Sequence, residues 1–154
     1  MAEEQDAAPR YFAKEIVREM VQLYSRRLGR GPTKARIIAN TNAIMVIFED
    51  GLTKAEQTLL TAGDADQVMR NRQRVTEAMR AESTSIIQSL TGRTVTAYLT
   101  GLDAEANVSA TMFLLDSKPE TGKVEVAEEN VGGNEDVGEE GVEGDAGSRA
   151  APLG

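Results

Sequence analysis

Arginine is the residue type whose spacing in this sequence most directly suggests chemistry. Five cations and no acid lie within residues 26–36, where a predicted helix ends, and two more arginines lie four residues apart on a later helix. Such groups can bind anions or acidic protein surfaces. Cations near a helix C-terminus also complement the helix dipole, so a structural role explains Arg26 and Arg27 without any ligand. The candidate partner or anion contacts are Arg26, Arg27, Arg30, Arg36, Arg70 and Arg74.

Arg72 differs from the other arginines because it falls on the apolar stripe of its predicted helix. Val68, Arg72, Val75 and Met79 follow one another at three- and four-residue steps. We therefore expect Arg72 at the edge of the core, with a carboxylate or carbonyl partner. A buried structural ion pair is favoured over a ligand contact.

The chain lacks two residue types on which much protein chemistry depends. It has no Cys and no His, which excludes disulfides, thiolate or imidazole metal ligands, Cys nucleophiles and any Ser-His-Asp arrangement. The remaining hydroxyl, amine and carboxylate groups show no spacing that pairs a nucleophile with its base. Glu49 and Asp50 are adjacent carboxylates, but two residues are too few to enclose a hard cation. We therefore expect no catalytic, cofactor or metal site and predict a non-enzymatic protein.

The net charge of -8 is unevenly distributed along the chain. Residues 1–116 hold 14 basic and 15 acidic side chains, whereas residues 117–154 hold ten acidic and three basic ones. The latter stretch also contains eight of the 14 Gly residues and cannot bury enough apolar area to offset its ordering entropy. We predict a flexible leader over residues 1–9, one folded domain over residues 10–116 and a disordered acidic Gly/Glu-rich tail over residues 117–154.

The elements that must position the arginines follow from the apolar pattern. Apolar residues recur at four-residue steps over residues 9–28, which predicts an amphipathic helix. Residues 35–40 and 43–49 are rich in Ile and Val and predict a tight hairpin. Thr53-Lys54-Ala55-Glu56 fits a capping box, so we expect a short helix over residues 54–61.

The second half of the domain repeats this order. Asp64 can cap a long helix whose apolar stripe extends to Leu90, and Thr91-Gly92 ends it. Residues 94–102 and 108–115 then predict a second hairpin. The predicted fold class is α+β, an αββ(α)αββ pseudo-repeat that forms a four-stranded antiparallel sheet with helices packed on one face.

Five short motifs in the folded segment have a recognisable order and spacing. They are Gly29-x-Gly31-Pro32, Gly51-Leu52-Thr53-x-x-Glu56-x-x-Leu59, Val68-x-x-x-Arg72, Leu90-Thr91-Gly92-x-x-Val95 and Leu102-Asp103-x-x-x-Asn107. This pattern resembles the MpsC-like family, formerly a domain of unknown function, over about residues 10–116. The family is named for a sodium-translocating, membrane-potential-generating system. The resemblance implies a small protein that works with or beside integral membrane subunits of an ion or bicarbonate uptake system, and it carries no catalytic residues onto this chain.

The sequence also bears on location. The longest uncharged run, residues 37–48, is far shorter than the roughly 20 apolar residues that span a bilayer. The first residues are acidic and show no secretory signal. We expect a cytoplasmic protein, peripheral at the inner face of the membrane where it serves such a system.

Three functions stay open at this point. The leading hypothesis is a non-enzymatic accessory or regulatory protein whose domain binds a protein partner, either an integral membrane transport subunit or a second copy of itself. The alternative is an anion or nucleotide sensor that uses the arginine faces. The third is nucleic-acid binding, which is disfavoured because the domain is nearly neutral and only 4% of the residues are aromatic.

Overall fold

The computed structural model describes residues 8–119 and 125–130. Residues 1–7 of the predicted leader, and residues 120–124 and 131–154 of the predicted tail, lie outside the described residues. Along the chain the elements are α1 (Ala8–Leu28), β1 (Lys34–Asn40), β2 (Ala43–Glu49), α2 (Lys54–Thr61), α3 (Ala65–Ala78), α4 (Arg80–Thr91), β3 (Val95–Asp103), β4 (Val108–Leu115) and β5 (Glu125–Asn130).

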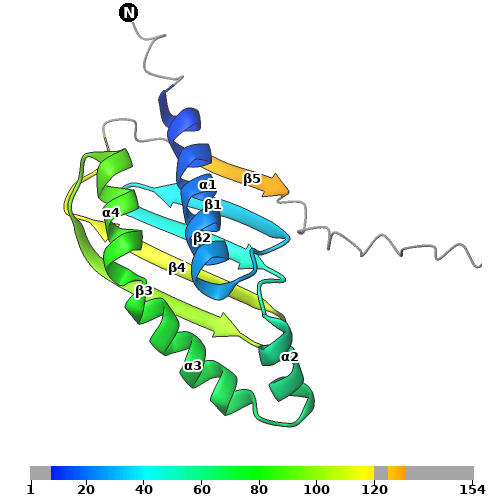
Figure 1. Ribbon diagram of the computed structural model, residues 1–154. Coiled ribbons are helices and arrows are strands. Elements are labelled where there is room, and N and C mark those ends of the chain that lie inside the picture. The colour runs from blue at the N-terminus through cyan, green and yellow to red at the C-terminus, as the bar shows by residue number, and fades with distance from the viewer. Residues whose placement is uncertain (1–7, 120–124, 131–154) are drawn as a thin grey trace, which may run out of the picture.

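The strands form one antiparallel sheet in the order β3-β4-β2-β1-β5. Figure 1 shows α1, α3 and α4 on one face of this sheet, with α2 near one end of it. The prediction of an α+β fold, with helices packed on one face of an antiparallel sheet, is confirmed. All four predicted strands are present, and the pairing of β2 with β4 joins the two hairpins at the centre.

The core lies between the helices and the covered face of the sheet. On α1, Ile16, Met20 and Leu23 are fully buried, at the three- and four-residue spacing of one helix face. Alternate strand residues meet them, because successive side chains of a strand point to opposite faces. The buried strand residues of this layer include Ile44, Val46, Phe48, Thr111, Phe113 and Leu115.

The two halves of the domain end their long helices in the same way. Gly29 follows α1 with a φ of 75°, and Gly92 follows α4 with a φ of 64°. This left-handed conformation closes many helices and has little steric cost for Gly. Each Gly turn leads into a hairpin, so the order of helix, Gly turn and hairpin occurs twice in the structure.

A fifth strand extends the sheet beyond the prediction. Residues 125–130, which the composition assigned to the disordered tail, form β5 and pair antiparallel with β1. The tail prediction has to be corrected for these residues. Backbone pairing gives the physical reason, because an unpaired strand edge offers N–H and C=O groups that an added strand satisfies without forming a large apolar core.

The predicted long helix is two helices, α3 and α4, separated at Met79. The Thr76 hydroxyl donates to the carbonyl groups of Arg72 at 2.9 Å and Gln73 at 3.1 Å. The Tyr98 hydroxyl donates to the Thr76 carbonyl at 2.7 Å, just before the break. Side chains that bond into the helical backbone bend or interrupt a helix, and apolar periodicity does not report such contacts.

Candidate functional site

Arg72 joins α3 to the first turn of α2. Its side chain is almost fully buried, and its Nε donates to Glu56 Oε1 at 2.9 Å. Its Nη2 donates to Glu56 Oε2 and to the Gly51 carbonyl. Glu56 also completes the predicted capping box, because it accepts from the Thr53 N–H at 2.8 Å while the Thr53 hydroxyl accepts from the Glu56 N–H. The predicted buried ion pair of Arg72 is confirmed.

Two opposing effects act on the pKa of Glu56. Partial burial alone would raise this pKa, but the hydrogen bonds from Arg72 and from the Thr53 backbone favour the carboxylate. The hydrogen bonds and the Arg72 charge together outweigh burial, so the pKa of Glu56 lies below its usual value. Both members of the pair are therefore charged at neutral pH.

Asn107, in the turn between β3 and β4, holds the segment that leads into α2. Its Oδ1 accepts from the Leu52 N–H at 3.1 Å, and its Nδ2 donates to Asp50 Oδ1 at 3.2 Å. Arg30 binds the same segment, donating to Asp50 Oδ2 at 3.2 Å and to the Leu52 carbonyl. Asp50 and Asn107 both have positive φ, 56° and 54°, which Asp and Asn tolerate better than most residues. The end of α1, the β3–β4 turn and the start of α2 are thus tied together.

The motifs singled out in the sequence converge on these contacts, which we call the loop cluster: Arg30, Asp50, Gly51, Leu52, Thr53, Glu56, Arg72 and Asn107. Gly31 belongs to the same region, and a Cβ at this position would lie 2.5 Å from the Ser25 hydroxyl oxygen. Each polar motif residue of the loop cluster has a partner inside the fold. The loop cluster contains no pairing of a nucleophile with a base, and its arrangement fits a structural role.

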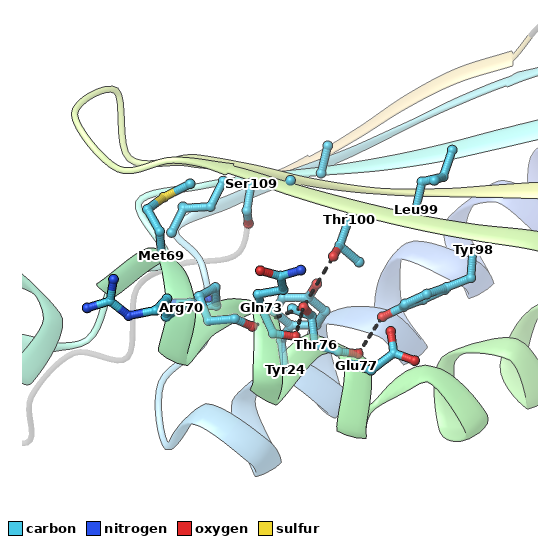
Figure 2. A pocket seen from close by; sticks show the side chains of 14 residues that line it. Tyr24, Met69, Arg70, Gln73, Thr76, Glu77, Tyr98, Leu99, Thr100 and Ser109 are labelled. Carbon is cyan, nitrogen blue, oxygen red and sulfur yellow. Dashed lines mark hydrogen bonds between the residues drawn. The ribbon is translucent and has the colours of Figure 1, made fainter. Parts of the chain in front are cut away.

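A groove of about 450 Å³ lies between α3 and the edge strand β3. Figure 2 shows Met69 and Gln73 on the helix wall and Thr100 pointing from the strand toward the helix, with Ser109 of β4 also on the strand side, whereas Leu99 points away from the helix. The hydroxyl oxygens of Thr76 and Thr100 lie 3.2 Å apart and connect the two walls. The groove therefore combines hydroxyl groups inside with the apolar side chain of Met69 at its mouth.

Two tyrosines beneath the groove are hydrogen-bonded and protonated at neutral pH. Tyr24 lies 2.9 Å from the Thr111 hydroxyl, and burial raises the pKa of Tyr24 more than this bond lowers it. Tyr98 bonds the Thr76 carbonyl, and burial, with a smaller contribution from Tyr24, raises the pKa of Tyr98 to about 12. Neither phenol is suited to proton transfer near neutral pH, which fits the prediction of a non-catalytic domain without testing it.

The face of the sheet opposite the helices is apolar along its centre. Strand register places Leu99, Met112, Met45 and Ile38 side by side, one from each of β3, β4, β2 and β1. The neighbouring row consists of Gly101, Ala110, Ile47 and Arg36. We call these eight residues the open face, because none of the described helices covers them (Figure 1). Within it, Arg36 has a buried Nε that bonds no group among the described residues.

Three of the predicted contact arginines lie where α1 ends and the following turn begins. Arg27 forms an ion pair with Glu82 of α4, and Arg30 pairs with Asp50. Arg26 is exposed at the last turn of α1. Two of these three guanidinium groups thus already have carboxylate partners within the fold.

The other predicted contact arginines lie on two separate surfaces. Arg36 is on the open face, whereas Arg70 and Arg74 are exposed on α3 beside the groove. Arg70 donates to Gln67 at 3.1 Å, one turn away. The structure therefore divides the six predicted arginines among three places, and their role as contacts stays a prediction.

Sequence reasoning did not single out the groove or the open face. A signal for the open face was present, because residues 43–48 are apolar without alternation and so must be apolar on both sides of the sheet. The groove left no such signal. Met69 and Leu99 come from elements 30 residues apart in the chain, and their approach depends on how α3 lies beside β3.

The fold and its sites define a class of protein: a two-layer α+β domain with one uncovered sheet face and structural polar clusters. None of the helices in the described ranges is both long and apolar enough to cross a membrane. Within the same ranges, no three metal-binding side chains gather at one point.

The chain belongs to the MpsC family, whose model matches residues 10–117 and is described as the Na+-translocating membrane potential-generating system. The resemblance inferred from the motifs is confirmed. The family's name associates this domain with a membrane-potential-generating sodium system. No curated protein and no solved structure matches the chain.

Proposed function

We propose that this protein is a non-enzymatic accessory protein that binds a protein subunit of a membrane-potential-generating sodium system. The open face is the surface that binds the subunit. The observation that carries the proposal is the unbroken apolar row of Leu99, Met112, Met45 and Ile38 across an uncovered sheet face. Family membership supports the choice of system.

The chemistry of the open face supports a protein partner. An antiparallel sheet covered on one side usually alternates apolar and polar residues, with the polar ones facing water. Here the central rows instead hold Met45, Ile47 and Met112 on the uncovered side. Continuous uncovered apolar surface of this kind is typical of interaction sites.

Arg36 adds a polar requirement to this surface. Its Nε is buried beside the apolar rows and bonds no described group, although a buried donor without a partner costs about 1–3 kcal/mol. A carboxylate or carbonyl group of the partner would satisfy it. The partner subunit is therefore expected to present an apolar patch with one acceptor opposite Arg36. Binding to a subunit of the membrane system would place the protein in the cytoplasm, at the inner face of the membrane.

Affinity capture from native membranes tests the proposal. The tagged full-length chain should recover a subunit of the sodium system, and Met112→Lys and Arg36→Glu should each reduce that recovery. Lys54→Glu, on the exposed face of α2, reverses a charge as Arg36→Glu does and should leave recovery unchanged. If the chain recovers no such subunit, or if the open-face variants recover it as well as the wild type, the proposal fails.

The anion or nucleotide sensor has less support, because Arg27 and Arg30 already pair with Glu82 and Asp50. A thermal-shift assay distinguishes this sensor function from the binding of a protein partner. A ligand at 100 times its Kd should stabilise the folded chain by about 2.7 kcal/mol, so a panel of anions and nucleotides that produces no shift removes this function.

A further inference from the structure

The outer edge of β3 is a strand edge without the usual protection. β3 is the last strand of the sheet and pairs only with β4 among the described strands. Its nine residues carry no charge before Asp103 and no Pro. Natural edge strands are commonly blunted by charges, Pro, bulges or a covering element, because their free N–H and C=O groups pair readily with another strand. β3 has a register shift near Val95, which leaves the stretch from Ala97 onward regular.

The groove beside this edge lies where the side chains of one more strand would pack. α3 forms its lower wall, and β3 forms its upper wall (Figure 2). A strand added next to β3 would place every second side chain into the groove against α3, because strand side chains alternate between the two faces. The volume of about 450 Å³ is enough for several side chains.

An exposed apolar side chain lies on each side of the β3 edge, Met69 on the groove side and Leu99 on the open face. Met69 on α3 is 39% exposed, and Leu99 on β3 is 53% exposed. No other large apolar side chain in the described residues is as exposed as these two. A strand added beside β3 would cover both, Met69 with the side chains that enter the groove and Leu99 with those that point to the open face, which favours its binding.

Arg70 and Glu77 line the groove on the helix side, and Arg74 lies beside it. Arg70 and Arg74 lie one turn apart on α3, and neither has a carboxylate partner among the described residues. In contrast, Arg72 and Arg80 of the neighbouring turns pair with Glu56 and Glu77. The two unpaired cations indicate that the occupant is acidic.

We propose that an extended, acidic segment of a partner protein binds in this groove as an additional strand beside β3. Its backbone pairs with β3, its inward apolar side chains pack against Met69, its outward side chains lie beside Leu99, and a carboxylate faces Arg70 and Arg74. This is strand addition, in which main-chain hydrogen bonds give affinity and alternate side chains give specificity. The groove lies on the helix side of β3 and the open face on its other side; Leu99 is the residue that both proposals use, and this proposal does not depend on the one above.

A displayed library of random peptides, long enough to pair along all of β3, tests the proposal with the full-length chain as bait. Selected peptides should carry apolar residues at alternate positions and at least one acidic residue on the side that faces α3. Hydrogen exchange of the complex should show new protection at the amides of Val95–Asp103. Fluorescence anisotropy of a selected peptide should show at least a tenfold weaker Kd for the double variant Arg70→Glu, Arg74→Glu.

Two comparisons keep the test specific. Lys14→Glu changes the charge of the exposed side of α1 and should leave peptide affinity unchanged, whereas Leu99→Lys should weaken it without touching the helix. Selection of no peptide, or protection confined to other strands, would overturn the proposal. It would also be overturned by a concentration-dependent dimer that protects β3 without peptide, because the occupant would then be a second copy of the chain.

Discussion

Arg72 and Glu56 form a two-point ion pair that connects α3 with the first turn of α2, and only 4% and 12% of their side chains are exposed. Arg72 also donates to the Gly51 carbonyl, and Glu56 accepts from the Thr53 N–H. The pair thereby holds the segment between β2 and α2 against α3, while Asn107 of the β3–β4 turn binds the same segment. This ion pair therefore connects α2 directly to the groove-forming helix α3.

Glu56→Gln should therefore destabilise the fold strongly. The variant keeps the shape of the side chain but leaves the Arg72 guanidinium almost buried without its counter-charge, which costs about 3 kcal/mol. Urea unfolding followed by circular dichroism measures this loss. Glu105→Gln, in the exposed β3–β4 turn, removes the same charge and should change the free energy of unfolding by less than about 0.5 kcal/mol. Equal stability of the two variants would contradict the structural role of the pair.

The pKa of Glu56 sets a pH dependence for the same contact. Because the folded-state pKa lies below the ordinary value of 4.5, the stabilisation is fully present above about pH 4.5 and is lost as pH falls through the folded-state pKa. The difference in melting temperature between wild type and Glu56→Gln should shrink as the pH is lowered below 4.5. A difference that stays constant from pH 7 to pH 3 would show that the charge of Glu56 does not stabilise the fold.

The elements that sequence predicted best are those with local causes. The capping box of Thr53 and Glu56 specifies its own helix start, and the Gly92 turn specifies a helix end. The ion pair of Arg72 was predictable because an arginine on an apolar stripe requires a partner, although the stripe does not identify Glu56 as that partner. The break at Met79 was not predictable, since the contacts beside it include the hydrogen bond from the Tyr98 hydroxyl to the Thr76 carbonyl, 22 residues apart in the chain.

The candidate surfaces depend even more on contacts between residues that are distant in the chain, and the sequence alone did not predict them. Open-face residues are assigned to their side by strand register, and the order β3-β4-β2-β1-β5 follows from pairing between distant hairpins. The groove exists because α3 lies beside β3, and no periodicity in either element specifies that distance. The arginines were visible in the sequence, but only the structure shows that Arg27 and Arg30 are paired while Arg70 and Arg74 are not paired with a described carboxylate.

Tyr98→Phe should test the contact at the break between α3 and α4. The variant keeps the ring, which packs against Phe113 and lies 5.3 Å below the Arg80 guanidinium, but it removes the hydroxyl that bonds the Thr76 carbonyl. We expect a loss of about 1 kcal/mol in the free energy of unfolding at neutral pH. A variant as stable as wild type would show that this hydrogen bond does not contribute to the fold.

Alkaline titration gives a second measurement on Tyr98. Its folded-state pKa is raised from 10.0 to about 12, so its contribution to stability is present below pH 10 and is lost as pH rises toward 12. Wild type should lose more stability than Tyr98→Phe over that window. The near-ultraviolet phenolate signal of the folded protein should also lack the component that titrates near pH 12 in the variant. If the component persists, it belongs to another tyrosine.

Asn107 should contribute through both its side chain and its backbone conformation. Asn107→Ala removes the bonds to Leu52 and Asp50 and places a less tolerant residue at a φ of 54°, with an expected cost of about 2–3 kcal/mol. Asn107→Gly removes the same bonds without the steric cost, so it should be about 1 kcal/mol more stable than the Ala variant. Thermal melts of the wild type, the Ala variant and the Gly variant measure these differences in stability. A Gly variant as stable as wild type would show that the side-chain bonds contribute nothing.

The fifth strand makes a prediction about the boundary of the fold. β5 lies beyond residues 10–117 that the family model matches, yet it pairs with β1 over residues 125–130. A chain that ends at residue 130 keeps this pairing, whereas a chain that ends at residue 116 leaves the β1 edge unpaired beside the open face. The shorter chain should lose about 2 kcal/mol in urea unfolding and should self-associate more readily, because its exposed edge can pair with another molecule. The longer truncation is the matched control and should unfold like the full-length chain. If both truncations unfold alike, β5 adds nothing to the stability of the sheet, and the folded unit ends with β4.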